Sequence, residues 1–84
     1  MANYEVLIAR KALKEAERIP KNYLNKINQA IKDLELNPFP AGVKKLVGSQ
    51  NSYRIRIGDY RVIYLREGNV IKIISIMHRR EAYR

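Results

Sequence analysis

The chain has 84 residues, a formal net charge of +9, one histidine and no cysteine. This length predicts one domain, residues 1–84, with a modest hydrophobic core. The composition excludes disulfides and thiolate metal sites and leaves no ordinary zinc or iron ligand set, so we expect neither a metal nor a cofactor. The positive charge favours nucleic acid or an acidic protein as the partner. A lipid surface ranks last, because no helix combines a basic face with large aromatic anchors.

The sequence carries no signal for membrane insertion or export. No stretch approaches the roughly 20 apolar residues of a membrane span. The N-terminus also lacks the apolar region of a signal peptide. We therefore expect a cytoplasmic protein without a membrane partner.

The first half of the chain predicts one strand followed by two helices. Residues 4–8 are apolar and β-branched enough for a short strand. Apolar residues then recur at helical spacing in two stripes separated by Pro20, and the second stripe stops at Asn37-Pro38. A helical hairpin packed on the core is favoured over a cofactor or partner groove. The stripes consist of Ala12, Leu13, Ala16 and Ile19, then Leu24, Ile27, Ile31 and Leu34.

Prolines and glycines punctuate residues 38–51, which predicts a loop. Lys44 and Lys45 lie in this loop. They are candidate contacts to a nucleic-acid backbone, although a solvated lysine pair is the simpler interpretation.

In the second half of the chain the apolar residues alternate with a period of two, which is typical of strands. Strands are expected over residues 53–57, 60–66 and 70–77, with tight turns at residues 58–59 and 67–69. They form an antiparallel meander, which the N-terminal strand is expected to join. The predicted fold class is therefore α+β, with a strand and a two-helix hairpin packed on an antiparallel meander.

The two-residue turn at Gly58-Asp59 fixes which residues of the first hairpin lie opposite each other. Arg56 then faces Arg61, and Arg54 faces Ile63, so the three arginines share one face of the sheet. Like charges directly opposite cost stability. The pairing therefore indicates an anion site, unless the side chains simply splay into water. The other face, expected against the helices, holds Tyr53, Ile55, Ile57, Val62 and Tyr64.

A two-residue register at the second turn extends the arginine face onto the last strand. This register makes the face partly apolar, which is typical of a binding surface. A sheet buried on both sides explains the apolar residues equally well. The residues added from the last strand are Lys72, Ile74, Ile76 and His78, and the apolar residues of the face are Ile63, Leu65, Ile74 and Ile76.

Arginine and lysine are segregated along the chain. Seven of nine arginines lie in the last 34 residues, and seven of eight lysines lie in the first 50. Arginine holds a phosphate at two points, whereas lysine is a flexible and well-hydrated charge. The C-terminal part, where tyrosines alternate with arginines, is therefore interpreted as a phosphate-binding surface. The alternative is that the basic strands only keep the protein soluble and bind no phosphate.

The chain ends in HRREAYR, which includes His78, Arg79, Arg80 and Tyr83. RNA cleavage without metal needs a base for a 2′-hydroxyl, cations for the phosphate and an acid for the leaving oxygen. Arginines supply the cations. His78 is a candidate for proton transfer, because histidine is the side chain that ordinarily titrates near neutral pH. Tyr83 is a candidate for stacking on a base or bonding a ribose hydroxyl. A lone surface histidine is the alternative for His78.

Three segments together resemble the RelE/ParE superfamily of bacterial and archaeal type II toxins. They are YRIRIGDYRVIY at residues 53–64, HRREAY at 78–83, and the upstream NP…VKKLVGS. The resemblance covers nearly the whole chain. It implies a RelE-like fold and a toxin that a cognate, RelB-like antitoxin neutralises. It also implies that the pair binds operator DNA only as a complex, and that the toxin cleaves mRNA in the ribosomal A site without metal.

The resemblance also implies roles for individual residues. Arg61 matches the phosphate-binding arginine, and Arg79 matches the arginine that stabilises the transition state, with Arg80 as its alternative. Tyr83 matches a tyrosine that orients the mRNA, while Arg54 and Arg56 occupy basic positions. Some relatives have lysines at those two positions. Because arginine is a poor base, His78 and Tyr83 are the alternatives for the base.

Two functions stay open at this point. The first is a ribosome-dependent endoribonuclease, and the second is a ParE-like inhibitor of DNA gyrase without nuclease activity. The presence of His78, Arg79 and Tyr83 favours the nuclease, because a protein that only binds gyrase needs no proton-transfer group beside phosphate-binding arginines. An inactive member that only binds its antitoxin is a third reading.

Overall fold

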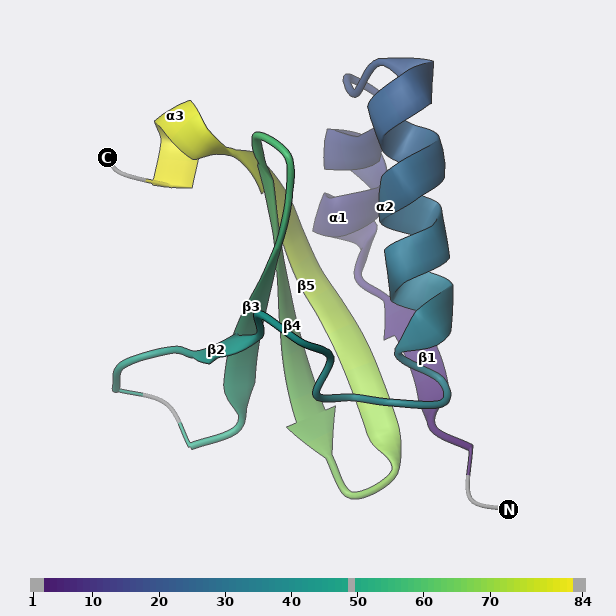
Figure 1. Cartoon of the computed structure of the whole chain (residues 1–84), viewed down its shortest axis with the longest axis vertical. Helices are drawn as coiled ribbons and strands as arrows, with labels where there is room; N and C mark the ends of the chain where they lie inside the picture. Colours follow the sequence, from purple (N-terminus) through teal and green to yellow (C-terminus); the bar gives the residue numbers. More distant parts are fainter. Residues whose placement is uncertain (1–2, 49, 83–84) are drawn as a thin grey trace.

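The computed structural model of the chain describes residues 3–48 and 50–82. A five-stranded sheet carries helices α1 and α2 on one side, and the short helix α3 follows the end of β5 (Figure 1). None of the helices in the described ranges is both long and apolar enough to cross a membrane. In chain order the elements are β1 (Glu5–Ile8), α1 (Arg10–Ala16), α2 (Lys21–Asp33), β2 (Lys44–Lys45), β3 (Ser52–Ile57), β4 (Tyr60–Glu67), β5 (Val70–His78) and α3 (Arg79–Ala82).

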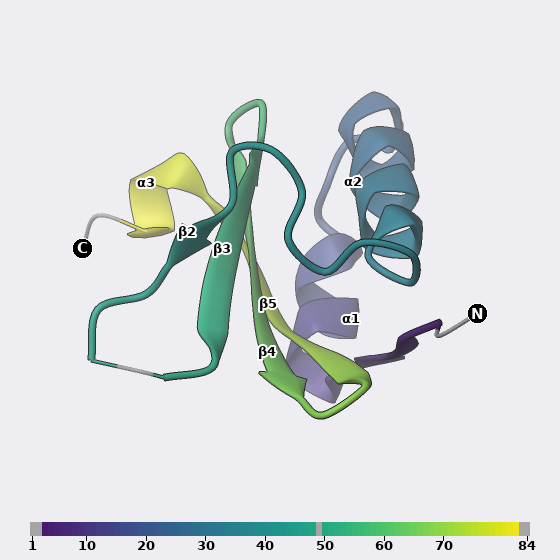
Figure 2. The ribbon, with the colours of Figure 1, turned by 60° about the horizontal axis from the view of Figure 1, so that its bottom comes forward.

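The sheet has the strand order β1-β5-β4-β3-β2. Strand β1 pairs in parallel with β5, and every other pair is antiparallel. Turned by 60°, the molecule shows α1 and α2 on the same side of the twisted meander (Figure 2). The predicted α+β class is confirmed, with the N-terminal strand joined to the meander at its β5 edge.

The core lies between the two helices and the sheet. Ile27 and Ile31 of α2 and its C-cap residue Leu34 are buried as predicted, but Leu13 of α1 is 53% exposed, so its assignment to the core was wrong. Helix α1 ends at Ala16, and Pro20 stands at the N-cap of α2 rather than inside a helix. On the sheet the buried apolar residues are Ile55, Val62, Tyr64, Ile71, Ile73 and Ile76.

Tyr64 is the largest fully buried side chain. Its hydroxyl donates to the carbonyl oxygen of Pro38 at 2.6 Å, which ties the loop after α2 to the sheet. Burial, together with the neighbouring Tyr53, raises the pKa of Tyr64 to about 12. The phenol is therefore held neutral as a core hydrogen-bond donor.

Two short elements escaped sequence prediction. Residues 44–45, predicted as loop, form β2 and pair with Arg54 and Tyr53 of β3. The last described residues form α3, a single helical turn directly after β5. Both are too short for apolar periodicity to reveal them.

The β4–β5 ladder contains one register shift, between Ile63 and Tyr64. An extra residue in β5 makes Val62 pair with Ile76 and Tyr60 pair with His78. The prediction that Ile76 and His78 share the arginine face was therefore wrong. Because a bulge changes which face the following residues occupy, both side chains lie on the helix side of the sheet.

A carboxylate from α1 holds the chain just beyond this bulge. The N–H of Ile76 donates to Glu15 Oε1 at 2.9 Å, and Ser75 Oγ donates to the same oxygen at 2.9 Å. Lys11 Nζ donates to Ser75 Oγ at 3.0 Å and lies 3.4 Å from Glu15 Oε2. Helix α1 thus stabilises the irregular part of β5.

Candidate nucleic-acid interface

Four cations gather on the side of the sheet away from α1 and α2. The pairing of Arg54 with Ile63 and of Arg56 with Arg61 follows the predicted register. Strand β2 adds Lys44, which lies opposite Arg54. A hollow of about 180 Å³ is lined by Gly42, Lys44, Arg54, Arg56 and Arg61, and it is called the cationic hollow below.

Arg61 forms the floor of the cationic hollow rather than its rim. The residue is only 2% exposed, although the sequence predicted an open phosphate-binding arginine. Its Nη1 donates to the carbonyl oxygens of Tyr60 at 3.3 Å and Gly58 at 3.4 Å. Because a buried charge requires polar partners, Arg61 is fixed in place and gives the hollow a permanent positive potential.

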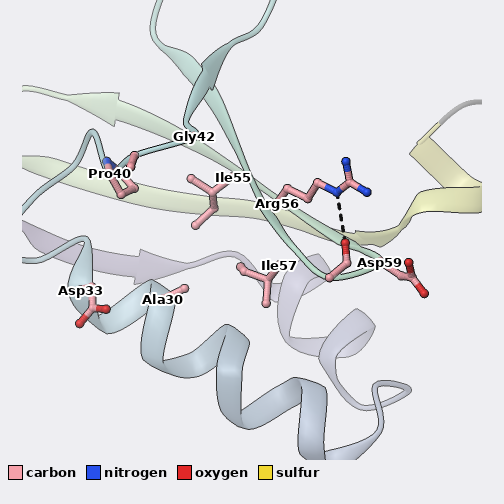
Figure 3. A pocket seen from close by; sticks show the side chains of 10 residues that line it. Ala30, Asp33, Pro40, Gly42, Ile55, Arg56, Ile57 and Asp59 are labelled. Carbon is pink, nitrogen blue, oxygen red and sulfur yellow. Dashed lines mark hydrogen bonds between the residues drawn. The ribbon is translucent and has the colours of Figure 1, made fainter.

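The carbonyl oxygen of Gly58 also accepts a hydrogen bond from Arg56, the second arginine of the opposed pair. Arg56 Nε donates to Gly58 O at 3.4 Å, and the side chain is exposed (Figure 3). One main-chain oxygen therefore lies between two guanidinium groups. This shared acceptor offsets part of the repulsion between Arg56 and Arg61 and points both charges at the same region.

The β3–β4 turn also fixes the start of α3. The N–H of Arg79 donates to the carbonyl oxygen of Asp59 at 2.7 Å. Arg79 Nη1 lies 4.0 Å from Asp59 Oδ1, and both side chains are about half exposed. The turn Gly58-Asp59 thus connects Arg79 to the cationic hollow. Sequence reasoning assigned Asp59 only a turn role and missed this connection.

His78 lies apart from the cationic hollow. Its ring meets the ring of Tyr60 edge-on, with centroids 5.3 Å apart, and Tyr60 in turn packs on Tyr23 of α2. His78 lines a hollow together with Glu15 of α1, Arg18 just beyond that helix, and Glu81 of α3. The bulge in β5 explains this position, which the sequence did not predict.

The Nδ1 atom of His78 accepts the N–H of Arg80 at 3.2 Å. This bond requires an unprotonated Nδ1 and holds the first turn of α3. Arg80 itself is exposed and does not line the cationic hollow. His78 is thus placed to position α3 rather than to touch a group bound over Arg56.

The two remaining predicted site residues are Lys45 and Tyr83. Lys45 pairs with Tyr53, so it lies on the alternate face from Lys44 and is exposed. The prediction for Tyr83 falls outside the described residues.

A larger, more apolar groove of about 590 Å³ adjoins the cationic hollow. It runs between α2 and β3, with Ala30, Ile55 and Ile57 on its walls (Figure 3). Arg56 and Gly42 line both depressions. A group bound in the groove therefore contacts the same arginine that borders the hollow.

Together these features suit a phosphodiester. Arg54, Arg56 and Lys44 present charge at the surface, and Arg61 adds charge from below. Guanidinium groups bind phosphate at two points and stabilise charge that grows on its oxygens. The gathered side chains supply cations, and among residues 3–48 and 50–82 none that lines the hollow is a ready proton acceptor.

Comparisons with known proteins agree with this fold. The family model of the "ParE toxin of type II toxin-antitoxin system, parDE" matches residues 6–83. A curated Methanocaldococcus jannaschii protein named "Putative toxin RelE1" is 36% identical over 96% of both chains. Toxin RelE3 of the same organism is 30% identical over 94% of both chains.

A solved structure shows the same fold at similar sequence identity. The toxin chain in the crystal structure of the archaeal RelE-RelB complex from Pyrococcus horikoshii OT3 superposes with a TM-score of 0.82. It is 35% identical, and the match covers 94% of this chain and 97% of that one. The chain described here therefore belongs to the RelE/ParE superfamily of type II toxin-antitoxin systems and is a RelE toxin.

Proposed function

We propose that this toxin is a ribosome-dependent endoribonuclease that cleaves mRNA in the A site by metal-free attack of a 2′-hydroxyl. The cationic hollow is the single observation that carries the proposal. It combines exposed Arg56 and Lys44 and half-buried Arg54 with buried Arg61, and the Gly58-Asp59 turn joins it to Arg79. A surface of this kind holds a phosphate and stabilises its transition state.

In the proposed reaction the 2′-oxygen forms a bond to the adjacent phosphorus while the bond from phosphorus to the 5′-oxygen breaks. The 2′-hydroxyl proton passes to a base, and an acid protonates the leaving 5′-oxygen. Arg56 and Arg61 neutralise the phosphate, and Arg79 stabilises the added charge. Tyr83 is the proposed proton-transfer residue of this chain, since His78 lies on the helix side of the sheet.

The requirement for the ribosome follows from what the hollow lacks. The described residues that line the hollow bind charge, and they include no carboxylate or imidazole to take a proton. A flexible mRNA must also be held with its 2′-oxygen in line with the scissile bond. We propose that the ribosomal A site supplies this alignment.

The proposed partner for regulation is a cognate, RelB-like antitoxin. Structures similar to this chain include RelE-RelB toxin-antitoxin complexes from Methanococcus jannaschii and Pyrococcus horikoshii. An acidic antitoxin segment suits a protein of charge +9. We place this regulation in the cytoplasm and expect contact with operator DNA only through the complex.

A second candidate is a ParE-like gyrase inhibitor, because the matching family model is that of the ParE toxins. One experiment separates the two. Purified toxin is added to a translation extract and to a gyrase supercoiling assay, and mRNA ends are mapped with and without ribosomes. The nuclease predicts cuts within A-site codons only when ribosomes are present. Intact mRNA together with blocked supercoiling would instead establish the gyrase function.

A further inference from the structure

Helix α3 is held at its start rather than by burial. It is a single turn of four residues, Arg79–Ala82, and the side chains of Arg79, Arg80 and Glu81 are exposed. One isolated turn is not stable by itself, because its few hydrogen bonds do not offset the conformational entropy lost in forming it. The hydrogen bonds to its first residues therefore determine where Arg79 lies.

Two hydrogen bonds anchor this start, and they respond differently to pH. The N–H of Arg79 donates to the main-chain oxygen of Asp59 at 2.7 Å, and the N–H of Arg80 donates to His78 Nδ1 at 3.2 Å. His78 thus acts as an N-cap, whose side chain accepts from the residue two positions later. A main-chain oxygen accepts at every pH, whereas Nδ1 accepts only while it is unprotonated.

The surroundings of His78 offer other partners to a protonated ring. His78 lines a hollow of about 230 Å³ together with two carboxylates, Glu15 of α1 and Glu81 of α3. Arg18, just beyond α1, is the cation in this lining, and Tyr60 of β4 meets the imidazole ring edge-on. An imidazolium donates from both nitrogens. It therefore repels the N–H that the neutral ring accepts, while the two carboxylates attract it.

Without the bond to His78, the start of α3 depends on the β3–β4 turn. Among residues 3–48 and 50–82, its remaining anchors are the main-chain bond from Arg79 to Asp59 and the contact of Arg79 Nη1 with Asp59 Oδ1 at 4.0 Å. Both side chains of that contact are about half exposed, so the ion pair is weak. A catalytic group misplaced by about 1 Å costs up to about 10²-fold in rate.

We propose that His78 is a positioning residue whose unprotonated ring holds α3, and with it Arg79, beside the cationic hollow, and that protonation of this ring releases α3. The inference rests on the proposed role of Arg79 in mRNA cleavage. It adds a dependence on pH that the arginines of the hollow do not provide. Cleavage should weaken in mild acid, between about pH 8 and about pH 5, where a histidine changes its charge.

Two variants separate the ring of His78 from its hydrogen bond. His78→Asn keeps a side-chain acceptor for the N–H two residues later but does not titrate. His78→Phe keeps an aromatic ring against Tyr60 and removes the acceptor. Thermal unfolding checks that both variants fold.

Ribosome-dependent mRNA cleavage is measured for both variants and the wild type over this range of pH. Near pH 8 we expect His78→Asn within about threefold of wild type and His78→Phe about tenfold slower. The ratio of the wild-type rate to the His78→Asn rate should fall about tenfold toward acid. Proton transfers that both proteins share cancel in this ratio.

NMR of the free toxin follows the same event without ribosomes. The ring nitrogen shifts of His78 should report an unprotonated Nδ1 at neutral pH. On acidification the amide signals of Arg80 and Glu81 should move with the same midpoint as the ring. In His78→Asn these two amide signals should stay in place.

The outcomes separate this inference from the proposed nuclease function. A rate ratio that does not change with pH overturns the inference, and so does an Arg80 amide that does not follow the ring. Equal loss of cleavage in both variants near pH 8 overturns it as well, because His78 would then act on the substrate itself. If the amides follow the ring but the wild type cleaves no mRNA at any pH, the positioning of α3 stands and only the nuclease function is removed.

Discussion

The β3–β4 and β4–β5 hairpins of the sheet differ in what fixes the register of their strands. In the β3–β4 hairpin the pairing runs without interruption from Ile57↔Tyr60 to Ser52↔Leu65. In the β4–β5 hairpin it shifts once, and the backbone beyond the shift is held by Glu15, 61 residues away in sequence from Ile76. The arginines of the cationic hollow therefore depend on a local turn, while His78 and α3 depend on a distant helix.

This difference separates two tasks of the toxin. Three of the phosphate-binding charges, Arg54, Arg56 and Arg61, lie on the regular hairpin, whose register is set without α1. The orientation of the C-terminal turn, where Arg79 begins α3, requires both the Gly58-Asp59 turn and the bulge. Variants in the two regions should consequently fail in different ways.

The largest expected effect comes from the exposed arginine of the regular hairpin. Arg56→Ala should lower ribosome-dependent mRNA cleavage by about 10²–10³-fold, because it removes a cation from the phosphate. Its melting temperature should hardly change, since the side chain is exposed and makes one long hydrogen bond. Lys32→Ala, which removes an exposed charge from α2, is the control. Undiminished cleavage by Arg56→Ala contradicts the assignment.

The buried arginine should behave differently from its exposed neighbour. Arg61→Ala leaves a cavity and frees the carbonyls of Gly58 and Tyr60, so we expect a stability loss of about 2–3 kcal/mol in addition to lost cleavage. Chemical denaturation of both variants measures the contrast. If Arg61→Ala unfolds at the same denaturant concentration as Arg56→Ala, the guanidinium of Arg61 is not held as described.

Glu15→Ala tests the irregular hairpin. It leaves the N–H of Ile76 without its acceptor, which should cost about 1–3 kcal/mol. Amide NMR signals of β5 and α3 should shift, while those of Arg54 and Arg56 stay in place. Glu15→Gln keeps an oxygen acceptor and should lose less. Shifts spread evenly over both hairpins would show that the two regions are not independent.

The smallest expected effect is a loss of stability at alkaline pH, which comes from Tyr64 in the core. The folded protein holds the phenol proton of Tyr64 up to a pKa of about 12, above the ordinary value of 10.0. The folded state then binds more protons than the unfolded state between these values, so stability is full below pH 10 and falls as pH rises toward 12. Tyr64→Phe loses the bond to Pro38, about 1 kcal/mol, and should flatten this decline relative to wild type.

How much the sequence could foretell depended on the range of the interactions involved. The hairpin of Arg54, Arg56 and Arg61 was predictable because a two-residue turn sets its register within ten residues or so. Lys44 was recognised as a candidate, but not its pairing with Arg54, since β2 has too few residues to show a pattern. The position of His78 was not predictable, because the bulge depends on Glu15 in a different element. The burial of Arg61 also follows from packing over the strands rather than from their pattern.

We propose above that the cationic hollow binds the scissile phosphate of an mRNA in the ribosomal A site. The most direct test is electron cryomicroscopy of this toxin on a ribosome whose A-site codon carries 2′-O-methyl groups that block cleavage. We predict the A-site phosphate over Arg54, Arg56 and Lys44, with Arg79 beside it. A message lying elsewhere on the toxin, with the hollow empty, would contradict this account.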